Sequence, residues 1–339
     1  MRPVRSILLT SLLVSIASLW PAQAQSIWET SGKLHVGGEG GWDYVTVDAG
    51  SHRLFVTRTT HTLVLDAGSG KTLADIPGQR SAHGVAIVPA LSRGFITDGG
   101  GSGAIVVFDL KTYSVLGKLA AVPDTDGIIY DAGSNLILAS AGDSSALLAF
   151  KPDIDPVSGT IGAPIDLGGK PEFLAADGHG KAYVNLEDKD AVAVVDLNVR
   201  KVLAKWPVAP GGHPVGLSID AKTHRLFVGC RNPQKLVVMN TENGKVEASV
   251  PIGAGVDATG VSEGQAFASC RDGALIVAGE KNGKFSLIQT VKTPDGARTL
   301  AVDEKTHRIY LPTAEFEPAT TGRPKAKPDT FMIVVVEHH

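Results

Sequence analysis

The chain has 339 residues, of which 43% are hydrophobic, so its composition excludes a disordered protein and allows a large core. Lys and Arg total 32 against 35 for Asp and Glu, and the net charge of −3 disfavours tight binding to a nucleic-acid backbone. The two cysteines are too few for a disulfide framework or a Cys₄ zinc site. The length alone suggests about two domains, but an all-β fold of this size can form one.

The first 24 residues have the three parts of a secretory signal peptide. Arg2 and Arg5 supply a positive start, Ile7–Trp20 is an apolar stretch, and AQA ending at Ala24 is a small-x-small cleavage site. The apolar stretch is shorter than the about 20 residues that span a membrane comfortably. We therefore predict a signal peptide over 1–24, one mature domain over 25–339 without a transmembrane segment, and a periplasmic location. A retained anchor is the alternative.

The mature chain is built from repeats. The segments DYVTVDAGSHRLFVT, HGVAIVPALSRGFIT, VGLSIDAKTHRLFVG and RTLAVDEKTHRIYLP align without a gap. With three weaker copies, the seven units begin near Asp43, His83, Asp126, Glu172, Val215, Asp257 and Arg298. The first and last starts are 255 residues apart over six steps, or 42.5 residues per repeat. That period is typical of a four-stranded propeller blade of about 40–45 residues.

Each unit shows strands in the same order. In the first, YVTVD and RLFVT flank a turn, HTLVLD follows, and AGSGK leads to a fourth strand. The last unit ends with a third strand, FMIVVVE at Phe331–Glu337, so we predict that the N-terminal strand Ser31–Gly38 closes the seventh blade and removes its open edge. The predicted fold is all-β: a monomeric seven-bladed β-propeller of four-stranded antiparallel blades.

Several of these segments also carry a family resemblance. HRLFVT, KAYVN, HRLFVG and HRIYLP, with HPVGLSID, IGAGVDAT, GARTLAVD and IYLPTAEF, resemble the YVTN-repeat β-propellers, the YncE-like family of exported bacterial proteins. The resemblance covers essentially the whole mature chain and implies the propeller fold. It implies no single activity, because relatives include proteins without an assigned activity, DNA binders and lactonase-like enzymes. The Gly-His and Trp-Asp markers of WD40 repeats are missing from their usual places.

The repeat starts form a column of polar residues. Propeller binders and enzymes use one mouth of the central channel, where first strands begin. Six of the seven starting residues are ionisable, the exception being Val215. We predict a ligand-binding funnel made by Asp43, His83, Asp126, Glu172, Asp257 and Arg298, with His213 pointing into the same mouth. The alternative is that these are polar strand starts bonded to water or backbone.

The residue types in this funnel suggest a divalent metal. The metal-ligand candidates are Glu172, Asp126, Asp257, His83 and His213. Carboxylates favour Ca²⁺, whereas the two histidines favour a transition metal. Arg298 could pair with a carboxylate or orient an anionic ligand. In a metal-assisted, lactonase-type hydrolase, Glu172, His83 or Asp257 would be the catalytic candidates.

The ends of the second strands add a predicted rim. The rim residues are Arg58, Asp98, Asn185, Arg231, Arg271 and Glu315, which would widen the funnel and suit a polar or anionic ligand. The alternative is ordinary solvated surface charge. Cys230 and Cys270 occupy equivalent positions in neighbouring units, where they could be buried thiols, a disulfide, or ligands of a metal shared with histidine.

The sequence therefore predicts an exported propeller that binds a small ligand or a metal ion at its central mouth, as a binding or accessory protein. A metal-dependent lactonase-type hydrolase and a protein-interaction scaffold are the alternatives. The sequence has no G-x-S-x-G or H-E-x-x-H motif. We expect no nucleic-acid partner, because no basic run interleaved with aromatic residues is present.

Overall fold

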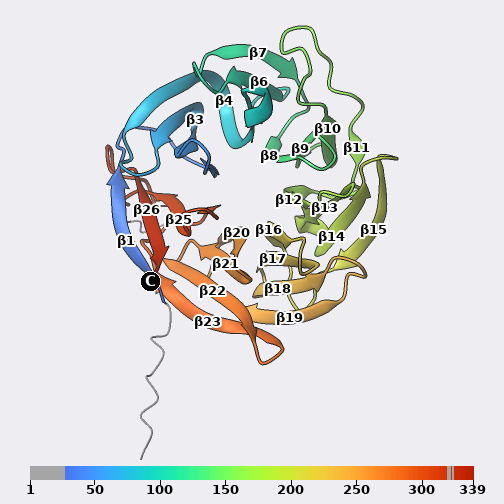
Figure 1. Ribbon diagram of the computed structural model, residues 1–339, viewed down its shortest axis with the longest axis vertical. Helices are drawn as coiled ribbons and strands as arrows, with labels where there is room; N and C mark the ends of the chain where they lie inside the picture. The colour runs from blue at the N-terminus through green and yellow to red at the C-terminus, as the bar shows by residue number, and fades with distance from the viewer. Residues whose placement is uncertain (1–26, 319–321, 323) are drawn as a thin grey trace, which may run out of the picture.

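The computed structural model describes residues 27–318, 322 and 324–339, so the predicted signal peptide lies outside the described residues. Its β-sheets are arranged as a ring around a central axis (Figure 1). Helical structure in the described ranges is limited to two short 3₁₀ turns, η1 (Pro89–Leu91) and η2 (Glu187–Lys189). Within those ranges, neither is long or apolar enough to cross a membrane.

The strands form one six-stranded and five four-stranded antiparallel sheets. The six-stranded sheet contains β2 (Val45–Asp48), β3 (Arg53–Asp66), β4 (Thr72–Val88), β5 (Arg93–Asp98), β6 (Ala104–Asp109) and β7 (Val115–Ala120). The next two contain β8 (Thr125–Asp131), β9 (Leu136–Ala141), β10 (Ala146–Phe150) and β11 (Ile165–Asp166), then β12 (Pro171–Ala176), β13 (Lys181–Leu186), β14 (Ala191–Asp196) and β15 (Lys201–Pro207). The last three contain β16 (Pro214–Asp220), β17 (Arg225–Arg231), β18 (Gln234–Asn240) and β19 (Val246–Pro251), then β20 (Val256–Ser262), β21 (Gln265–Cys270), β22 (Ala274–Lys281) and β23 (Lys284–Lys292), and finally β24 (Ala301–Asp303), β25 (Arg308–Thr313), β26 (Met332–His338) and β1 (Trp28–His35).

The predicted count of seven separate four-stranded blades is wrong, because the strands form six sheets. The all-β propeller with four-stranded antiparallel blades is confirmed, and the difference lies in the first two sequence repeats. The long strand β4 begins in the first repeat and continues past His83 into the second, so the units starting at Asp43 and His83 share one sheet. Within the first repeat, β3 is also continuous, because its link Arg58-Thr59-Thr60 contains no Gly, Pro, Asn or Asp, unlike the corresponding link DGGGSG of the second unit.

The predicted role of the N-terminal strand is also corrected, because the described residues form no seventh sheet for it to close. The strand runs from Trp28 to His35 rather than over Ser31–Gly38. It pairs antiparallel with β26 and is the outer strand of the sheet that also contains β25 and β24.

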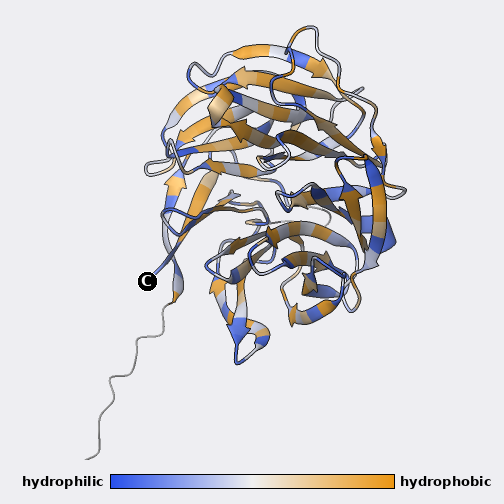
Figure 2. Cartoon of the chain, turned by 45° about the vertical axis from the view of Figure 1, so that its right-hand side comes forward, coloured by the Kyte–Doolittle hydropathy of each residue, from blue (hydrophilic) through white to orange (hydrophobic). Residues whose placement is uncertain are grey.

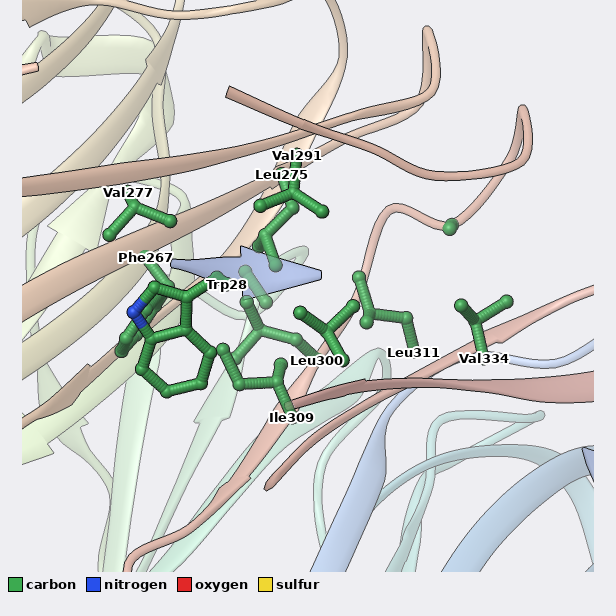
Figure 3. Close-up of a cluster of buried hydrophobic side chains, with 12 residues drawn as sticks. Trp28, Phe267, Leu275, Val277, Val291, Leu300, Ile309, Leu311 and Val334 are labelled. Atoms are coloured by element: carbon green, nitrogen blue, oxygen red, sulfur yellow. The ribbon is translucent and has the colours of Figure 1, made fainter. Parts of the chain in front are cut away.

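Trp28 attaches this outer strand to the neighbouring sheet. Its indole lies among apolar side chains of β21–β23 and of the β24–β26 sheet (Figure 3) and is only 2% exposed. The ring meets Phe267 edge-on at 4.8 Å between centroids, and its Nε1 donates to Gln265 Oε1 at 2.7 Å. A tryptophan buried to this extent contributes about 3 kcal/mol or more to stability.

The burial of each strand follows its distance from the axis. Middle strands such as β17 and β18 are buried on both faces, because neighbouring sheets cover both sides, and their sequences read as continuous apolar runs. The outer strand β15 alternates between exposed and partly buried residues, as expected for a strand with one solvent-facing side. Figure 2 shows apolar residues concentrated within the strands and hydrophilic residues in the connecting loops.

The innermost strands close the ring. They contact one another in the chain order β2, β4, β8, β12, β16, β20 and β24, and β24 contacts β2. Residues at the starts of these strands therefore surround the central axis at one end of the ring. This geometry positions the candidate site.

Candidate functional site

Buried hydroxyl and amide side chains fix the backbone of the mouth. Thr57 Oγ1 donates to the carbonyl of His83 at 2.7 Å, and Thr97 Oγ1 donates to that of Asp126 at 2.5 Å. Asn185 and Ser269 bind the carbonyls of Val215 and Arg298 at 2.9 and 2.6 Å. The four side chains that donate these bonds are fully buried, so four of the repeats position the first mouth residue of the next one.

Asp43, His83 and Asp126 meet on one side of the mouth. His83 Nδ1 is 2.7 Å from Asp43 Oδ2 and 3.4 Å from Asp126 Oδ1. The other ring nitrogen, Nε2, is 3.0 Å from Ser81 Oγ. One donor atom from each of the three residues lies within 4.8 Å of the other two. We call Asp43, His83 and Asp126 the acidic corner.

Close contacts within the acidic corner shift the pKa values of His83 and Asp126. Burial opposes protonation of His83, but the hydrogen bond to Asp43 and the charges of Asp126 and Asp124 outweigh it and raise its pKa to about 9. Burial and the neighbouring Asp43 raise the pKa of Asp126 to about 7. At neutral pH the His83 imidazole is therefore protonated, and the Asp126 carboxyl is close to its pKa.

Asp257 lies on another side of the mouth, between two arginines. Arg231 Nη2 donates to Asp257 Oδ1, and Arg298 Nη1 donates to Asp257 Oδ2. Arg231 Nε also donates to the carbonyl of Val256 at 3.0 Å. Arg298 Nη1 is 3.3 Å from Asp43 Oδ1 and so links this group to the acidic corner. We call Arg231, Asp257 and Arg298 the arginine cluster.

Glu172 shares a proton with Glu187. Lys170 Nζ and His213 Nε2 lie 2.6 and 3.0 Å from the two oxygens of Glu187. Burial, the charge of Asp126 and the hydrogen bond to Glu187 raise the pKa of Glu172 to about 8. Burial would raise the pKa of Glu187 as well, but the bonds from Lys170 and Glu172 hold it below its ordinary value. Glu172 is therefore the protonated partner at neutral pH.

Aromatic rings lie across the channel beneath these polar groups. Tyr44 precedes β2 and Phe173 belongs to β12, yet their ring centroids are 4.9 Å apart. Going round the ring of inner strands, β2 and β12 are not neighbours: β4 and β8 lie between them in one direction, and β16, β20 and β24 in the other. The contact between the two aromatic rings therefore crosses the central axis. Phe173 also lines an apolar cavity of about 330 Å³ together with inner-strand residues such as Val47 and Ile87. The mouth is therefore a polar cup above an apolar channel.

The predicted rim residues have different environments. Arg58 is buried, donates to the carbonyls of Gly37, Glu39, Gly40 and Gly41, and lies 4.0 Å above the Phe331 ring. Asn185 is buried and donates to the carbonyl of Val215. Asp98 is also buried and forms an ion pair with Lys118 at 2.7 Å. Arg231 belongs to the arginine cluster. Arg271 and Glu315 are exposed, and Glu315 pairs with Lys327 at 3.1 Å.

The predicted metal ligands do not all lie in one cluster. The cluster of possible metal-ligating groups found in the described ranges contains Asp43, His83 and Asp126 but not Glu172, Asp257 or His213. Asp257 is occupied by two guanidinium groups, and Glu172 and His213 both bind Glu187. Cys230 and Cys270 are free, buried thiols, and burial raises the pKa of each to about 12.

Sequence reasoning missed Glu187 and Lys170. Glu187 follows the backbone-anchoring Asn185 by two positions, and Arg231 and Arg271 follow Gly229 and Ser269 by the same two positions. Aligning the ends of the second strands on this anchor would have revealed Glu187. Lys170 lies in the loop before β12, where the repeats do not align, and no sequence signal marks it.

Comparisons with known proteins support the fold. The chain is similar to hydrazine synthase of Kuenenia stuttgartiensis, with a TM-score of 0.68 and 11% identity over 84% of this chain and 93% of that one. It is also similar to the WD40 β-propeller domain of Doa1, with a TM-score of 0.70 and 13% identity over 91% of this chain and 96% of that one. No protein-family model and no curated protein sequence matches the chain.

These similarities, together with the ring of antiparallel sheets, define the protein as a β-propeller. The propeller part of the predicted resemblance is thereby confirmed. The comparisons provide no support for membership of the YVTN-repeat family, which stays a prediction. A propeller fold is consistent with a binding or scaffold role.

Proposed function

We propose that the protein is an exported binding propeller that holds a small cationic ligand, an organic amine or a metal ion, in its central mouth. The observation that carries the proposal is the convergence of carboxylates in a cup that aromatic rings block below. The carboxylates are those of Asp43, Asp126, Glu172, Glu187 and Asp257. The permanently charged partners are Lys170, Arg231 and Arg298.

A small cation fits this charge balance. The carboxylates outnumber the permanent cations, and protons held by His83, Asp126 and Glu172 make up the difference. A bound cation would replace such protons and relieve the repulsion between carboxylates. An anion would have to compete with carboxylates that already occupy the arginines. The proposal therefore reverses the preference for anionic ligands suggested by the rim residues in the sequence.

Thermal unfolding of the whole protein tests this proposal. Putrescine, spermidine and divalent metal chlorides should raise the melting temperature, by about 4 °C at a hundred times the dissociation constant, whereas citrate should not. The double variant Asp126→Asn, Glu172→Gln removes two carboxylates from the mouth and should abolish the shift.

The matched control removes two carboxylates from the opposite end of the ring. Glu263 and Glu304 lie in the turns that follow β20 and β24 and line a separate surface cavity. The variant Glu263→Gln, Glu304→Gln removes the same number of carboxyl groups and should keep the full ligand shift. The proposal fails if no cation stabilises the wild-type protein, or if both double variants lose the shift to the same extent.

A further inference from the structure

The acidic corner has the donor atoms and spacing of a metal site. Ligands about 2.1 Å from a tetrahedral metal are about 3.4 Å apart. His83 Nδ1 is 3.4 Å from Asp126 Oδ1 and 2.7 Å from Asp43 Oδ2. A metal ion therefore requires Asp43 Oδ2 to move outward from Nδ1, and the three donor atoms already lie within 4.8 Å of one another.

The environment of His83 fixes the ring for coordination. Ser81 Oγ lies 3.0 Å from Nε2, the ring nitrogen that faces away from both aspartates. A hydrogen bond there, with Nε2–H donating, places the lone pair of a neutral imidazole on Nδ1, toward the carboxylates. The Ser81 backbone is held in turn, because its N–H donates to the buried Asp98 at 2.9 Å.

The two aspartates are held with one oxygen directed at His83. Arg298 contacts Asp43 Oδ1, which leaves Oδ2 facing the imidazole. Asp126 Oδ1 is shielded from solvent and accepts no hydrogen bond from any described residue, although it faces His83. A shielded carboxylate oxygen without a hydrogen bond is costly, and a cation would satisfy it.

The corner nevertheless stays accessible. The side chains of Asp43, His83 and Asp126 are 20%, 23% and 21% exposed. Water can therefore complete a coordination sphere that has three protein ligands.

From this geometry we infer that Asp43, His83 and Asp126 bind one divalent first-row transition metal ion, such as Zn²⁺ or Mn²⁺. The inference rests on the proposed function, since it names the cation that the mouth takes. An imidazole ligand favours a transition metal over Ca²⁺, which prefers six to eight oxygen ligands. The competing arrangement is a metal-free ion pair in which a protonated His83 lies between the two aspartates.

Calorimetric titration of the full, chelator-treated protein with ZnCl₂ and MnCl₂ tests the inference. We expect one equivalent to bind. His83→Ala and Asp126→Asn should weaken binding at least 100-fold, and Ser81→Ala, which removes only the partner of Nε2, by about 10-fold. Addition of Co²⁺ to the wild-type protein should produce visible ligand-field bands that Zn²⁺ abolishes. This measurement needs no variant, so misfolding of His83→Ala cannot obscure the result.

Two controls distinguish this corner from other histidines. His213→Ala, which changes the mouth histidine that contacts Glu187, should bind metal like the wild type. Replacing His338 and His339 at the C-terminal end should also leave the stoichiometry unchanged. The inference is overturned if the wild type binds no metal stoichiometrically, or if His83→Ala binds as tightly as the wild type. If spermidine still stabilises a protein that binds no metal, the metal assignment fails and the proposed function stands; if neither ligand binds, both fail.

Discussion

On one side of the mouth a single carboxylate lies between two guanidinium groups, and on another a single imidazole lies between two carboxylates. The first group is the arginine cluster and the second is the acidic corner. The acidic corner consists of three consecutive repeat starts, whereas the arginine cluster combines the repeat starts Asp257 and Arg298 with Arg231 from the end of β17. Arg298 contacts both groups. Both sides therefore present repeat-start side chains to the same mouth, and they differ in the ratio of acids to bases.

That ratio separates a structural role from a binding role. Asp257 is 6% exposed, and each of its oxygens accepts a charged hydrogen bond, so nothing remains for a ligand to satisfy. Asp126 has an oxygen without a hydrogen bond and a pKa raised to about 7. In a ring of similar repeats, an ionisable mouth residue becomes a candidate ligand only where its neighbours do not neutralise it.

The largest expected effect comes from breaking the arginine cluster. Asp257→Asn removes the paired carboxylate of Arg231 and leaves Arg298 with only its longer contact to Asp43, and we expect the free energy of unfolding to fall by about 3 kcal/mol. Urea denaturation measures the change. The control is Glu280→Gln, which breaks the exposed ion pair with Arg225 and should cost less than about 1 kcal/mol. A loss as small as that of Glu280→Gln would mean that Asp257 is not needed to neutralise the arginines on this side of the mouth.

A smaller effect, visible as a pH dependence, comes from the acidic side. The pKa of Glu172 is about 8 in the folded protein and 4.5 in its ordinary state, so the folded protein binds the extra proton between these values. The contribution of Glu172 to stability therefore falls as the pH rises from about 4.5 to 8. Burial, Asp126 and Glu187 raise this pKa, and Arg231 lowers it.

Glu172→Gln removes this titration, so its stability relative to the wild type should improve steadily from pH 5 to pH 8. Urea midpoints at several pH values measure the trend. Glu304→Gln, at the opposite end of the ring, should show a constant difference from the wild type. A pH-independent difference for Glu172→Gln would mean that Glu172 is ionised in the folded protein. The cations near Glu172 would then be sufficient to neutralise the carboxylates around it.

The sequence predicted the propeller because its repeat period and strand patterns are local features. The number of sheets was missed because it depends on whether one strand ends before the next begins. The strand β4 continues from Thr72 past the second repeat's start at His83 to Val88, so two repeats share a sheet, and the repeat period alone does not reveal this.

The column of repeat starts contained the residues that meet at the mouth, because equivalent positions of a ring face one axis. It did not show which of them neutralise one another. Asp126 and Asp257 look equivalent in the alignment, yet the side chains around them decide that one is paired with arginines and the other is not. Glu187 and Lys170 lie outside the column, and only the folded chain places them beside Glu172 and His213.

The smallest expected effect concerns the two thiols next to the arginine positions. Cys230 and Cys270 are fully buried, and the resulting pKa of about 12 keeps both protonated at neutral pH. A disulfide-exchange reagent such as DTNB should therefore not react measurably with the native protein at pH 7.5 but should modify two thiols per chain in urea. Rapid reaction of Cys230 in the native state would show that the strand next to Arg231 opens readily. The arginine cluster would then be the mobile side of the mouth rather than its rigid side.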